Sequence, residues 1–399
     1  MIRAVDSEKC CGCGACASVC PEKCITFAAD GEGFLCPSVD AKKCVGCNAC
    51  ERVCPMLAEP EKNTAVRACA VINTDKEVRL KSSSGGVFGL LAEDVLAQGG
   101  AVFGAAFDKD FAVRHICAPN AGELPLLFGS KYVQSDTTGL FETVKQFLDS
   151  DRQVLFSGTP CQVAGLKKSL GKNYPNLLTV DLVCHGVPSP AAWQKYLDFT
   201  KKKYSAEPCS VNFRSKVSGW KKYSVEILFK NGKAMREGVA DNLYMKAFLR
   251  NLSLRPSCYN CPFKGLERVS DITLADFWGV EHVCPDLDDG LGTSLVLVNS
   301  KRGLSSFEKL GSRVRVTETD ASEAVKYNSA AVKSVARPEN RDEFFRILQC
   351  CGFGKEMHRF LAEPFSVRLK KVVEKGGQSR YRKKIVRRYK TERKGNADA

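Results

Sequence analysis

Residues 10–21 read CCGCGACASVCP, and residues 44–55 read CVGCNACERVCP. Four cysteines in each segment follow the spacing C-x2-C-x2-C-x3-C, and proline comes next. Two-residue spacers let three thiolates converge on three corners of one iron–sulfur cube, while the fourth cysteine reaches the other cube. The repeat therefore predicts two 4Fe-4S clusters. The first is expected at Cys10, Cys13, Cys16 and Cys54, and the second at Cys20, Cys44, Cys47 and Cys50.

A pair of zinc knuckles is the alternative, but zinc sites usually take two cysteine pairs and not four cysteines and a proline in duplicate. Between the two runs, residues 25–27 and 34–39 are expected to form hairpin strands joined by a turn at residues 30–33. This pattern predicts a bacterial-type two-cluster ferredoxin fold over residues 1–56. Three further cysteines, Cys11, Cys24 and Cys36, are expected as small buried apolar side chains beside the clusters.

Cysteine usage separates the N-terminus from the rest of the chain. Eleven of the 21 cysteines fall within residues 1–54. Residues 1–9 lack the apolar core of a signal peptide, and no apolar run approaches the roughly 20 residues that span a bilayer. We therefore expect a cytoplasmic protein, in which thiols stay reduced and clustered cysteines bind metal instead of forming disulfides. The 399 residues are enough for two or three domains.

Positive charge is concentrated at the C-terminus. The chain has a net charge of +15, and residues 366–399 hold thirteen lysines and arginines against three acidic residues. This basic tail contains two aromatic residues, Tyr381 and Tyr389, too few for a stacking platform that would bind nucleic acid. We expect either a solvated charged helix or a segment attracted to an anionic membrane surface or to an acidic partner such as ferredoxin.

Residues 57–66 mix proline, charge and small polar side chains, which predicts a linker. A second domain is expected over residues 67–365, in which short apolar runs alternate with longer amphipathic stretches. This alternation predicts an α/β or α+β core behind the ferredoxin fold. The expected strands are residues 68–73, 101–107, 154–156, 178–183 and 294–299, and the expected helices are residues 87–98, 140–150 and 191–201. A hairpin is expected at residues 223–237, where Asn231-Gly232 is a turn signal.

The segment Ser82-Ser83-Ser84-Gly85-Gly86 directly precedes the helix expected over residues 87–98. A helix N-terminus presents unpaired N–H groups and a partial positive charge, and glycine lets a phosphate or a ring approach the backbone. This suits a flavin nucleotide, although serine and glycine are also ordinary helix caps. No G-x-G-x-x-G motif follows a strand and no P-loop pattern occurs, so neither a Rossmann-type nicotinamide site nor a nucleotide triphosphatase is supported.

Four cysteines of the second domain occur in distinctive settings. Cys161 and Cys184 each follow an expected strand, and Cys258 and Cys261 form a C-x2-C pair. Strand ends in such folds converge on one edge of the sheet, where the pair could complete a four-thiolate site. A third cluster, a zinc site, a redox-active dithiol at Cys258 and Cys261, and unrelated buried thiols all remain open on spacing alone.

Five segments of the second domain together resemble the coenzyme F420 hydrogenase/dehydrogenase beta-subunit family. They are residues 81–88 (KSSSGGVF), 129–135 (GSKYVQS), 156–162 (FSGTPCQ), 184–190 (CHGVPSP) and 271–279 (DITLADFWG). With the ferredoxin unit, the resemblance covers roughly residues 1–300. The family in turn is similar to 7-hydroxymethyl chlorophyll a reductase, so the shared chemistry is flavin with iron–sulfur clusters and the substrate varies.

The resemblance implies FAD in the second domain and a third 4Fe-4S cluster. The implied flavin-binding residues are Ser83, Ser84, Gly85, Gly86, Ser130, Lys131 and Tyr132, and the implied cluster ligands are Cys161, Cys184, Cys258 and Cys261. We expect an N-terminal part of the domain over residues 67–150 and a C-terminal part over residues 151–320. F420 itself is not implied as the substrate, because many bacterial members with this ferredoxin fusion resemble proteins of organisms in which that deazaflavin need not occur.

Lys131 and His185 are the candidates for stabilising charge or delivering protons near the flavin. The alternative for Lys131 is a contact to a phosphate or to the protein itself. The alternative for His185 is a hydrogen-bonded position behind the residues that touch the cofactor.

The predicted function follows from electron counting. A flavin exchanges two electrons and each cluster exchanges one, so the flavin couples two-electron chemistry to single-electron transfer. We expect an iron–sulfur flavoprotein oxidoreductase that passes electrons between a ferredoxin-like carrier docked near residues 1–56, the clusters, FAD and an organic or F420-type substrate. The alternative is a non-catalytic electron-relay subunit that docks on partner subunits of a larger oxidoreductase.

Overall fold

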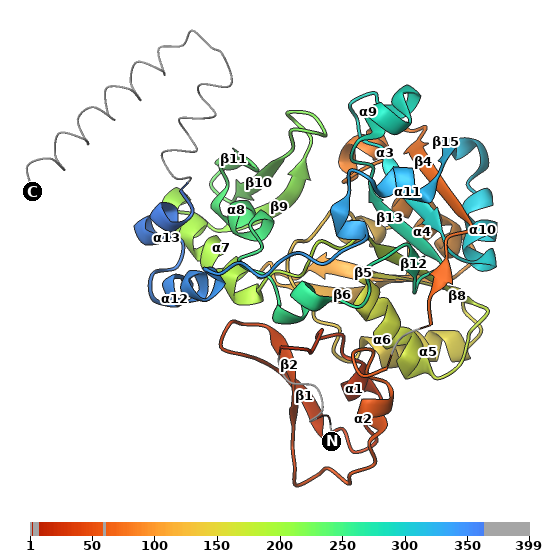
Figure 1. The fold of residues 1–399 in the computed structure, drawn as a ribbon, viewed down its shortest axis with the longest axis horizontal. Helices are drawn as coiled ribbons and strands as arrows, with labels where there is room; N and C mark the ends of the chain where they lie inside the picture. Colours follow the sequence, from red (N-terminus) through yellow and green to blue (C-terminus); the bar gives the residue numbers. More distant parts are fainter. Residues whose placement is uncertain (1, 3–7, 59–60, 363–399) are drawn as a thin grey trace, which may run out of the picture.

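The structure is a computed structural model that describes residue 2 and residues 8–58 and 61–362. The predicted basic tail lies outside the described residues. Three parts can be followed in Figure 1: the ferredoxin unit, a large sheet with helices on both faces, and a smaller lobe of helices around a second sheet. The predicted fold class, a ferredoxin fold followed by a mixed α/β domain, is confirmed.

The ferredoxin unit contains the expected hairpin. Strands β1 (Ile25–Ala29) and β2 (Leu35–Val39) are antiparallel, with Ile25 opposite Val39. Their turn is fixed by Asp30, whose carboxylate accepts hydrogen bonds from the amides of Glu32 and Phe34, both at 2.9 Å. The short helices α1 (Ala15–Ser18) and α2 (Ala49–Arg52) lie within the two cysteine runs.

The large sheet has the strand order β15-β4-β14-β13-β8-β7-β5-β6. Its strands are β4 (Arg67–Asn73), β5 (Ala101–Phe107), β6 (Val113–Ala118), β7 (Val154–Gly158), β8 (Leu177–Leu182), β13 (Ile272–Asp276), β14 (Ser294–Val298) and β15 (Val314–Thr319). The four central strands β13, β8, β7 and β5 are parallel, and the remaining pairings are antiparallel. The five strands predicted for this domain are confirmed, and β6, β13 and β15 join them.

Alternating strand residues bury both faces of this sheet. In β5, Val102 and Ala106 pack towards α4 (Val87–Ala97) and α10 (Lys301–Glu308), whereas Ala101 and Phe103 pack towards α5 (Leu140–Asp149) and α6 (Pro160–Leu170). This is the period of two that strands impose. Helices α3 (Lys76–Lys81), α9 (Val280–Val283) and α11 (Ala321–Val325) complete this part, with short 3-10 helices at Leu124–Leu127 (η1), Pro256–Asn260 (η2), Pro285–Leu287 (η3), Gly311–Arg313 (η4) and Ser329–Ala331 (η5).

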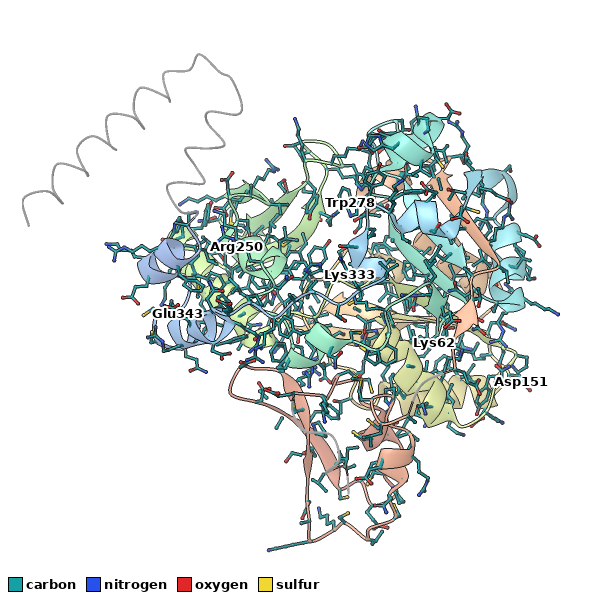
Figure 2. The ribbon with its side chains drawn as sticks, in the orientation of Figure 1. Lys62, Asp151, Arg250, Trp278, Lys333 and Glu343 are labelled. Carbon is teal, nitrogen blue, oxygen red and sulfur yellow. The ribbon has the colours of Figure 1, made fainter. Side chains whose placement is uncertain are left out.

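The smaller lobe is built on a three-stranded sheet. Strands β9 (Pro208–Ser215), β10 (Ser224–Phe229) and β11 (Ala234–Gly238) include the predicted hairpin. Helices α7 (Pro190–Tyr204), α8 (Leu243–Leu249), α12 (Arg341–Cys351) and α13 (Lys355–Phe360) surround it. Trp193 lies at the centre of the shared core, with ring centroids 4.9 Å from Phe213 and 5.1 Å from Tyr244. Trp278, which follows β13, lies between this lobe and the large sheet (Figure 2).

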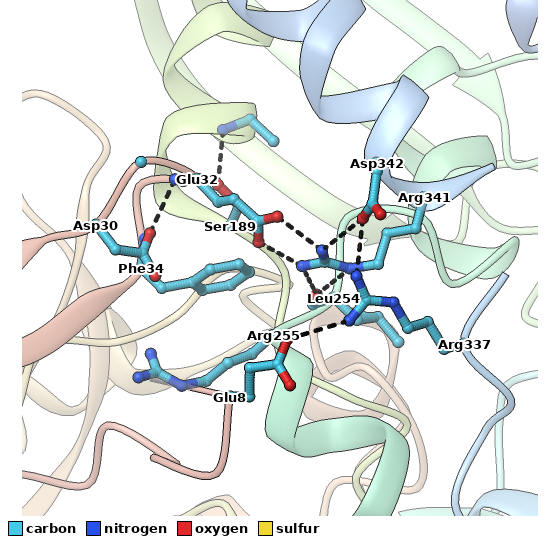
Figure 3. A network of polar contacts seen from close by, with 12 residues as sticks. Glu8, Asp30, Glu32, Phe34, Ser189, Leu254, Arg255, Arg337, Arg341 and Asp342 are labelled. Carbon is cyan, nitrogen blue, oxygen red and sulfur yellow. Dashed lines mark hydrogen bonds and ion pairs between the residues drawn. The ribbon is translucent and has the colours of Figure 1, made fainter. Parts of the chain in front are cut away.

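Both lobes hold the ferredoxin unit. Arg341, at the start of α12, binds the carboxylate of Glu32 through both terminal nitrogens, and one of these bonds measures 2.7 Å (Figure 3). Thr137, which precedes α5, donates a hydrogen bond to the carbonyl oxygen of Cys13 at 2.9 Å. Part of the predicted linker is also ordered, because β3 (Asn63–Thr64) pairs with β12 (Glu267–Arg268).

Candidate functional site

The cysteines of the ferredoxin unit form two groups. Cys10, Cys13, Cys16 and Cys54, the first cysteine group, line one small cavity, and Cys20, Cys44, Cys47 and Cys50, the second cysteine group, line another. Each group contains three cysteines of one run and the last cysteine of the other. Helices α1 and α2 produce this exchange, because each carries the third cysteine of its run and ends just before the fourth. Two 4Fe-4S clusters with exchanged ligands require this arrangement.

The spacing of these thiols does not suit a single zinc ion. Zn–S bonds of about 2.3 Å in a tetrahedral site place sulfur atoms about 3.8 Å apart. In the part of the chain that the structure describes, one trio of metal-binding side chains has all its ligand atoms within 4.8 Å of one another. This trio is Cys350, Cys351 and Glu356, which are exposed where α12 ends and α13 begins. The two ferredoxin groups are spaced more widely, which favours a four-iron cube over zinc.

The three remaining cysteines of the ferredoxin unit were expected as buried apolar side chains, and only Cys24 is fully buried. Cys36 accepts a hydrogen bond from Arg255 Nη2 at 3.0 Å. Hydrogen bonding with Cys36 is the main reason why the pKa of Cys10 is lowered to about 6. Cys11 interacts with Cys13 on one side and with Cys161 of the second domain on the other. The thiols of Cys11 and Cys36 are therefore polar contacts at the junction of the two domains.

The four cysteines Cys161, Cys184, Cys258 and Cys261, the third cysteine group, come together from three segments. Cys161 is the second residue of α6 and directly follows β7, and Cys184 follows the neighbouring parallel strand β8. Cys258 lies in η2, and Cys261 comes directly after it. Burial raises the pKa of Cys258, and the other three thiols raise it further, so all four lie within electrostatic range of one another.

Burial also raises the pKa of Cys184 to about 12, although Lys264 opposes the shift. Thiols with raised pKa values of this kind hold their protons tightly when no metal is bound. Metal ligation replaces those protons, because thiolate is the binding form and the metal supplies the compensating positive charge. The donor set therefore fits an iron–sulfur cluster.

A cavity of about 320 Å³ lies at the carboxyl ends of the parallel strands β5, β7, β8 and β13. Open α/β sheets bind ligands at this edge, and the volume is in the range of cofactor sites. Most of the residues predicted for the flavin line it: Ser83, Ser84, Gly86, Ser130, Lys131 and Tyr132. Gly85 does not, and its amide instead donates a hydrogen bond to the Ser294 hydroxyl at 2.9 Å. Cys11 and Cys161 line the same cavity, so the cavity reaches the cysteines.

The serine–glycine turn, Ser82–Gly86, opens onto this cavity at the start of α4. Gly86 is the N-cap residue of α4, with a φ of +82°, so the glycine cap considered from the sequence is formed and the serine cap is not. No side chain caps the first amides of α4. Arg214 Nη2 and Lys216 Nζ donate hydrogen bonds to the carbonyl oxygens of Ser83 and Ser84, at 3.4 and 2.9 Å. Uncapped amides flanked by two cations fit the negatively charged diphosphate of a flavin dinucleotide.

Arg214 also contacts residues outside the serine–glycine turn. Arg214 is buried and forms an ion pair with Asp276 at 2.9 Å, yet its Nε has no partner among the described residues. Its guanidinium also lies over the ring of Tyr223, 3.8 Å from the centroid. Burial lowers the pKa of the neighbouring Lys216 to about 8.

Lys131 lines the cavity, and its ammonium donates hydrogen bonds to the carbonyl oxygens of Leu126 and Phe128 at 2.9 and 2.7 Å. Burial lowers the pKa of Lys131 to about 7. His185 lies elsewhere: its Nε2 is 2.7 Å from Oδ1 of Asn251, and it is not among the described residues that line the cavity. The structure thus brings one of the two predicted proton-handling residues to the cavity.

His115, in β6, lines the cavity and was not predicted from the sequence. Its Nε2 lies 3.0 Å from the carbonyl oxygen of Ser157, which can only accept, so Nε2 carries the proton. Nδ1 then accepts from the hydroxyl of Ser135 at 2.6 Å. The ring stacks on Phe156, and burial lowers the pKa of His115 to about 4. At neutral pH His115 is therefore an uncharged group that fixes Ser135 as a hydrogen-bond acceptor towards the cavity.

Comparison with known proteins assigns both parts of the chain. Residues 9–58 match the model of the 4Fe-4S dicluster domain, and residues 151–324 match the model of the C terminus of the coenzyme F420 hydrogenase/dehydrogenase beta subunit. The chain carries the C-terminal domain of this beta-subunit family. The resemblance seen in the sequence is thereby confirmed, together with the iron–sulfur character of the N-terminal unit. The chain is thus an iron–sulfur protein whose residues 151–324 are related to the beta subunit of an oxidoreductase family.

Among solved structures, this chain is similar to a chain of the F420-reducing [NiFe] hydrogenase complex from Methanosarcina barkeri, solved as a xenon derivative. The TM-score is 0.46 with 16% sequence identity, over 67% of this chain and 91% of that chain. No curated protein matches the sequence. Among the described residues, no helix has both the length and the apolar character needed to cross a membrane.

Proposed function

We propose that this chain is an iron–sulfur flavoprotein oxidoreductase. In this proposal the first and second cysteine groups each hold a 4Fe-4S cluster, the third cysteine group holds another, and FAD occupies the 320 Å³ cavity. When bound, FAD would exchange two electrons with an organic or F420-type substrate, and the clusters would exchange single electrons with a ferredoxin-like carrier.

One observation carries the proposal: a single cavity is lined both by the serine–glycine turn and by Cys161 of the third cysteine group. A flavin in this cavity would lie next to a cluster held by that group. Cys11 also lines the cavity and belongs to the first cysteine run, so the ferredoxin unit reaches the same place.

The second cysteine group supports an entry point at the surface. Cys47 is exposed, and the nearby residue Val45 is 66% exposed. The first cysteine group is buried against the second domain instead, because Cys13 Sγ lies 2.7 Å from the position that a Cβ on Gly165 of α6 would take. We therefore propose that an external carrier, or a partner subunit of a larger oxidoreductase, exchanges electrons at the second group and that the first group relays them inward.

The deciding experiment is the content of iron, acid-labile sulfide and flavin in anaerobically purified protein. Three 4Fe-4S clusters and one FAD predict about twelve irons, about twelve sulfides and one flavin per chain. About eight irons without flavin would contradict the catalytic proposal and would make the chain an electron-relay subunit whose redox chemistry is confined to the ferredoxin unit.

A further inference from the structure

Arg255 is a fully buried arginine at the junction of the ferredoxin unit and the second domain. It directly precedes η2, which carries Cys258, and 1% of it is exposed. Its hydrogen bonds nevertheless run to the ferredoxin unit. Nε donates to the Cys10 carbonyl oxygen at 2.6 Å, Nη1 donates to the Leu35 carbonyl oxygen at 3.1 Å, and Nη2 donates to Cys36 Sγ at 3.0 Å.

Residues of the ferredoxin unit pack closely against the Arg255 side chain. A Cβ on Gly12 would come within 2.8 Å of Arg255 Nη1, and the ring of Phe34 lies under the guanidinium with its centroid 5.4 Å away (Figure 3). The repeat provides an internal comparison. Gly46 is the equivalent of Gly12 in the second run, and a Cβ there would meet no atom within 4 Å. The close approach of a buried arginine is thus specific to the first run.

Arg255 differs from the other buried arginines in its charge partner. Arg79, Arg214, Arg268 and Arg341 each form an ion pair with a carboxylate, in turn Asp289, Asp276, Asp181 and Glu32. No carboxylate in residues 8–58 or 61–362 forms an ion pair with Arg255, whose hydrogen bonds go to the carbonyl oxygens of Cys10 and Leu35 and to Cys36 Sγ. Arginine does not lose its proton in proteins, and a buried unpaired charge is strongly unfavourable, so an anion is required beside it.

We propose that Arg255 is the fixed counter-charge of the iron–sulfur cluster at the first cysteine group and that it raises the reduction potential of this cluster. The inference rests on the proposed function, which places a cluster there. Reduction adds one negative charge to a cluster. Burial therefore disfavours the reduced form, and a positive charge close to a ligand favours it. Arg255 is a positioning residue, because it contacts Cys10 and Cys36 and not the substrate.

The positive charge of Arg255 favours electron transfer from the second cysteine group towards the first. The second cysteine group lies at the surface, whereas the first lies between the surface and the cavity. A buried positive charge at the inner group stabilises an electron there. Electrons that arrive from an external carrier would then be held next to the third cysteine group and the cavity.

The test compares four variants of the full-length chain with the wild type. Arg255→Met and Arg255→Gln remove the charge, and Arg255→Lys keeps it. Arg341→Met is the matched control, because Arg341 is equally buried and also joins the ferredoxin hairpin to the second domain, through Glu32. None of the hydrogen bonds that Arg341 makes with described residues involves a cysteine.

The measurement is a redox titration followed by electron paramagnetic resonance, with iron and sulfide determined on the same samples. The signal of the first cluster is the one that Cys16→Ala removes. At the wild-type midpoint potential, we expect the ratio of reduced to oxidised first cluster to fall about tenfold in both neutral variants, a shift of about 59 mV to lower potential for one electron. Arg255→Lys and Arg341→Met are expected to keep the wild-type midpoint.

Each outcome either supports or overturns the inference about Arg255. Unchanged potentials in the neutral variants, or an equal shift in Arg341→Met, overturn the inference, the latter because loosened docking would then be the cause. If the neutral variants lose the iron of the first cluster, the result for Arg255→Lys is used instead. Iron retained in Arg255→Lys, with the wild-type potential, supports a role for the charge. Iron lost in Arg255→Lys overturns that role. Wild-type protein with fewer than about eight irons would contradict the two ferredoxin clusters on which this inference rests, which separates that failure from this one.

Discussion

Lys131, which is half-buried, and His115, which is buried, both line the cavity, and loss of solvent contact lowers the pKa of each to a different value. Lys131 has a pKa lowered to about 7, so it gains or loses its charge near neutral pH, whereas His115, with a pKa lowered to about 4, stays uncharged above pH 5. A histidine is ordinarily the residue that titrates near neutrality. In this cavity the side chain that titrates near neutral pH is Lys131.

We therefore predict that the affinity for FAD falls as the pH rises through 7. An anionic ligand binds the protonated form of Lys131 better, so the affinity should decrease up to about tenfold between pH 6 and pH 8, which corresponds to about 1.4 kcal/mol. Fluorescence titration of the deflavinated protein with FAD at pH 6, 7 and 8 measures the change. Lys131→Met should remove the pH dependence, and His115→Gln should keep it. The same slope in wild type and Lys131→Met would assign the titration to another group.

Sequence spacing found the residues whose partners are close in the chain. The cysteine runs could be grouped because C-x2-C spacers fix which thiolates converge, and the structure places each set around one cavity. His115 could not be found this way, because its partners Ser135 and Ser157 are 20 and 42 residues away. His185 follows Cys184 directly, but neighbours in sequence need not share a cavity, and its ring is held by Asn251.

Among the elements, the β1–β2 hairpin shows how a turn can set a domain contact. Gly33 has a φ of +86°, and a Cβ there would lie 2.2 Å from Cβ of Ala191 in α7. Gly31, two residues earlier in the same turn, has no atom within 4 Å of its Cβ position. The same substitution at these two positions should therefore have very different effects.

We predict that Gly33→Ala lowers the free energy of unfolding by about 2 kcal/mol or more, from the left-handed backbone and the overlap with α7. Gly31→Ala should change it by less than about 0.5 kcal/mol. Denaturant unfolding of the two variants under anaerobic conditions, monitored by circular dichroism, makes the comparison. Equal stability of both variants would show that the hairpin is not packed against α7 in solution.

The elements themselves were predictable where the periodicity was strong. The strands at residues 101–107 and the hairpin at Asn231-Gly232 appear as expected, because alternation and turn chemistry are local signals. β13 lies within the quoted segment at residues 271–279, but its run of Ile272 to Asp276 is too short to be told from a loop by periodicity. The pairing of β3 with β12 joins segments about 200 residues apart, and no local sequence pattern predicts this pairing.

The sequence predicted two domains but not how these domains contact each other. The contacts that dock the ferredoxin unit, Glu32 with Arg341 and Cys10 with Arg255, join residues 309 and 245 positions apart. They could not be read from spacing. They decide the arrangement nevertheless, because they place the first cysteine group between the exposed second group and the cavity.

This arrangement predicts that the third cysteine group is needed for electrons to pass between the ferredoxin unit and the flavin. Cys261→Ala should remove about four irons per chain and leave about eight irons and one FAD. The reason is that Cys261 lines neither the two small cavities of the first and second cysteine groups nor the 320 Å³ cavity. Stopped-flow reduction by a ferredoxin-type donor should then reduce the remaining clusters at the wild-type rate but the flavin at least tenfold more slowly. Cys209→Ala, at an exposed cysteine of β9, is the control and should keep about twelve irons and the wild-type rates. Flavin reduction at the wild-type rate in a Cys261→Ala protein that has lost its four irons would show that electrons reach the cavity from the first group directly, past Cys11.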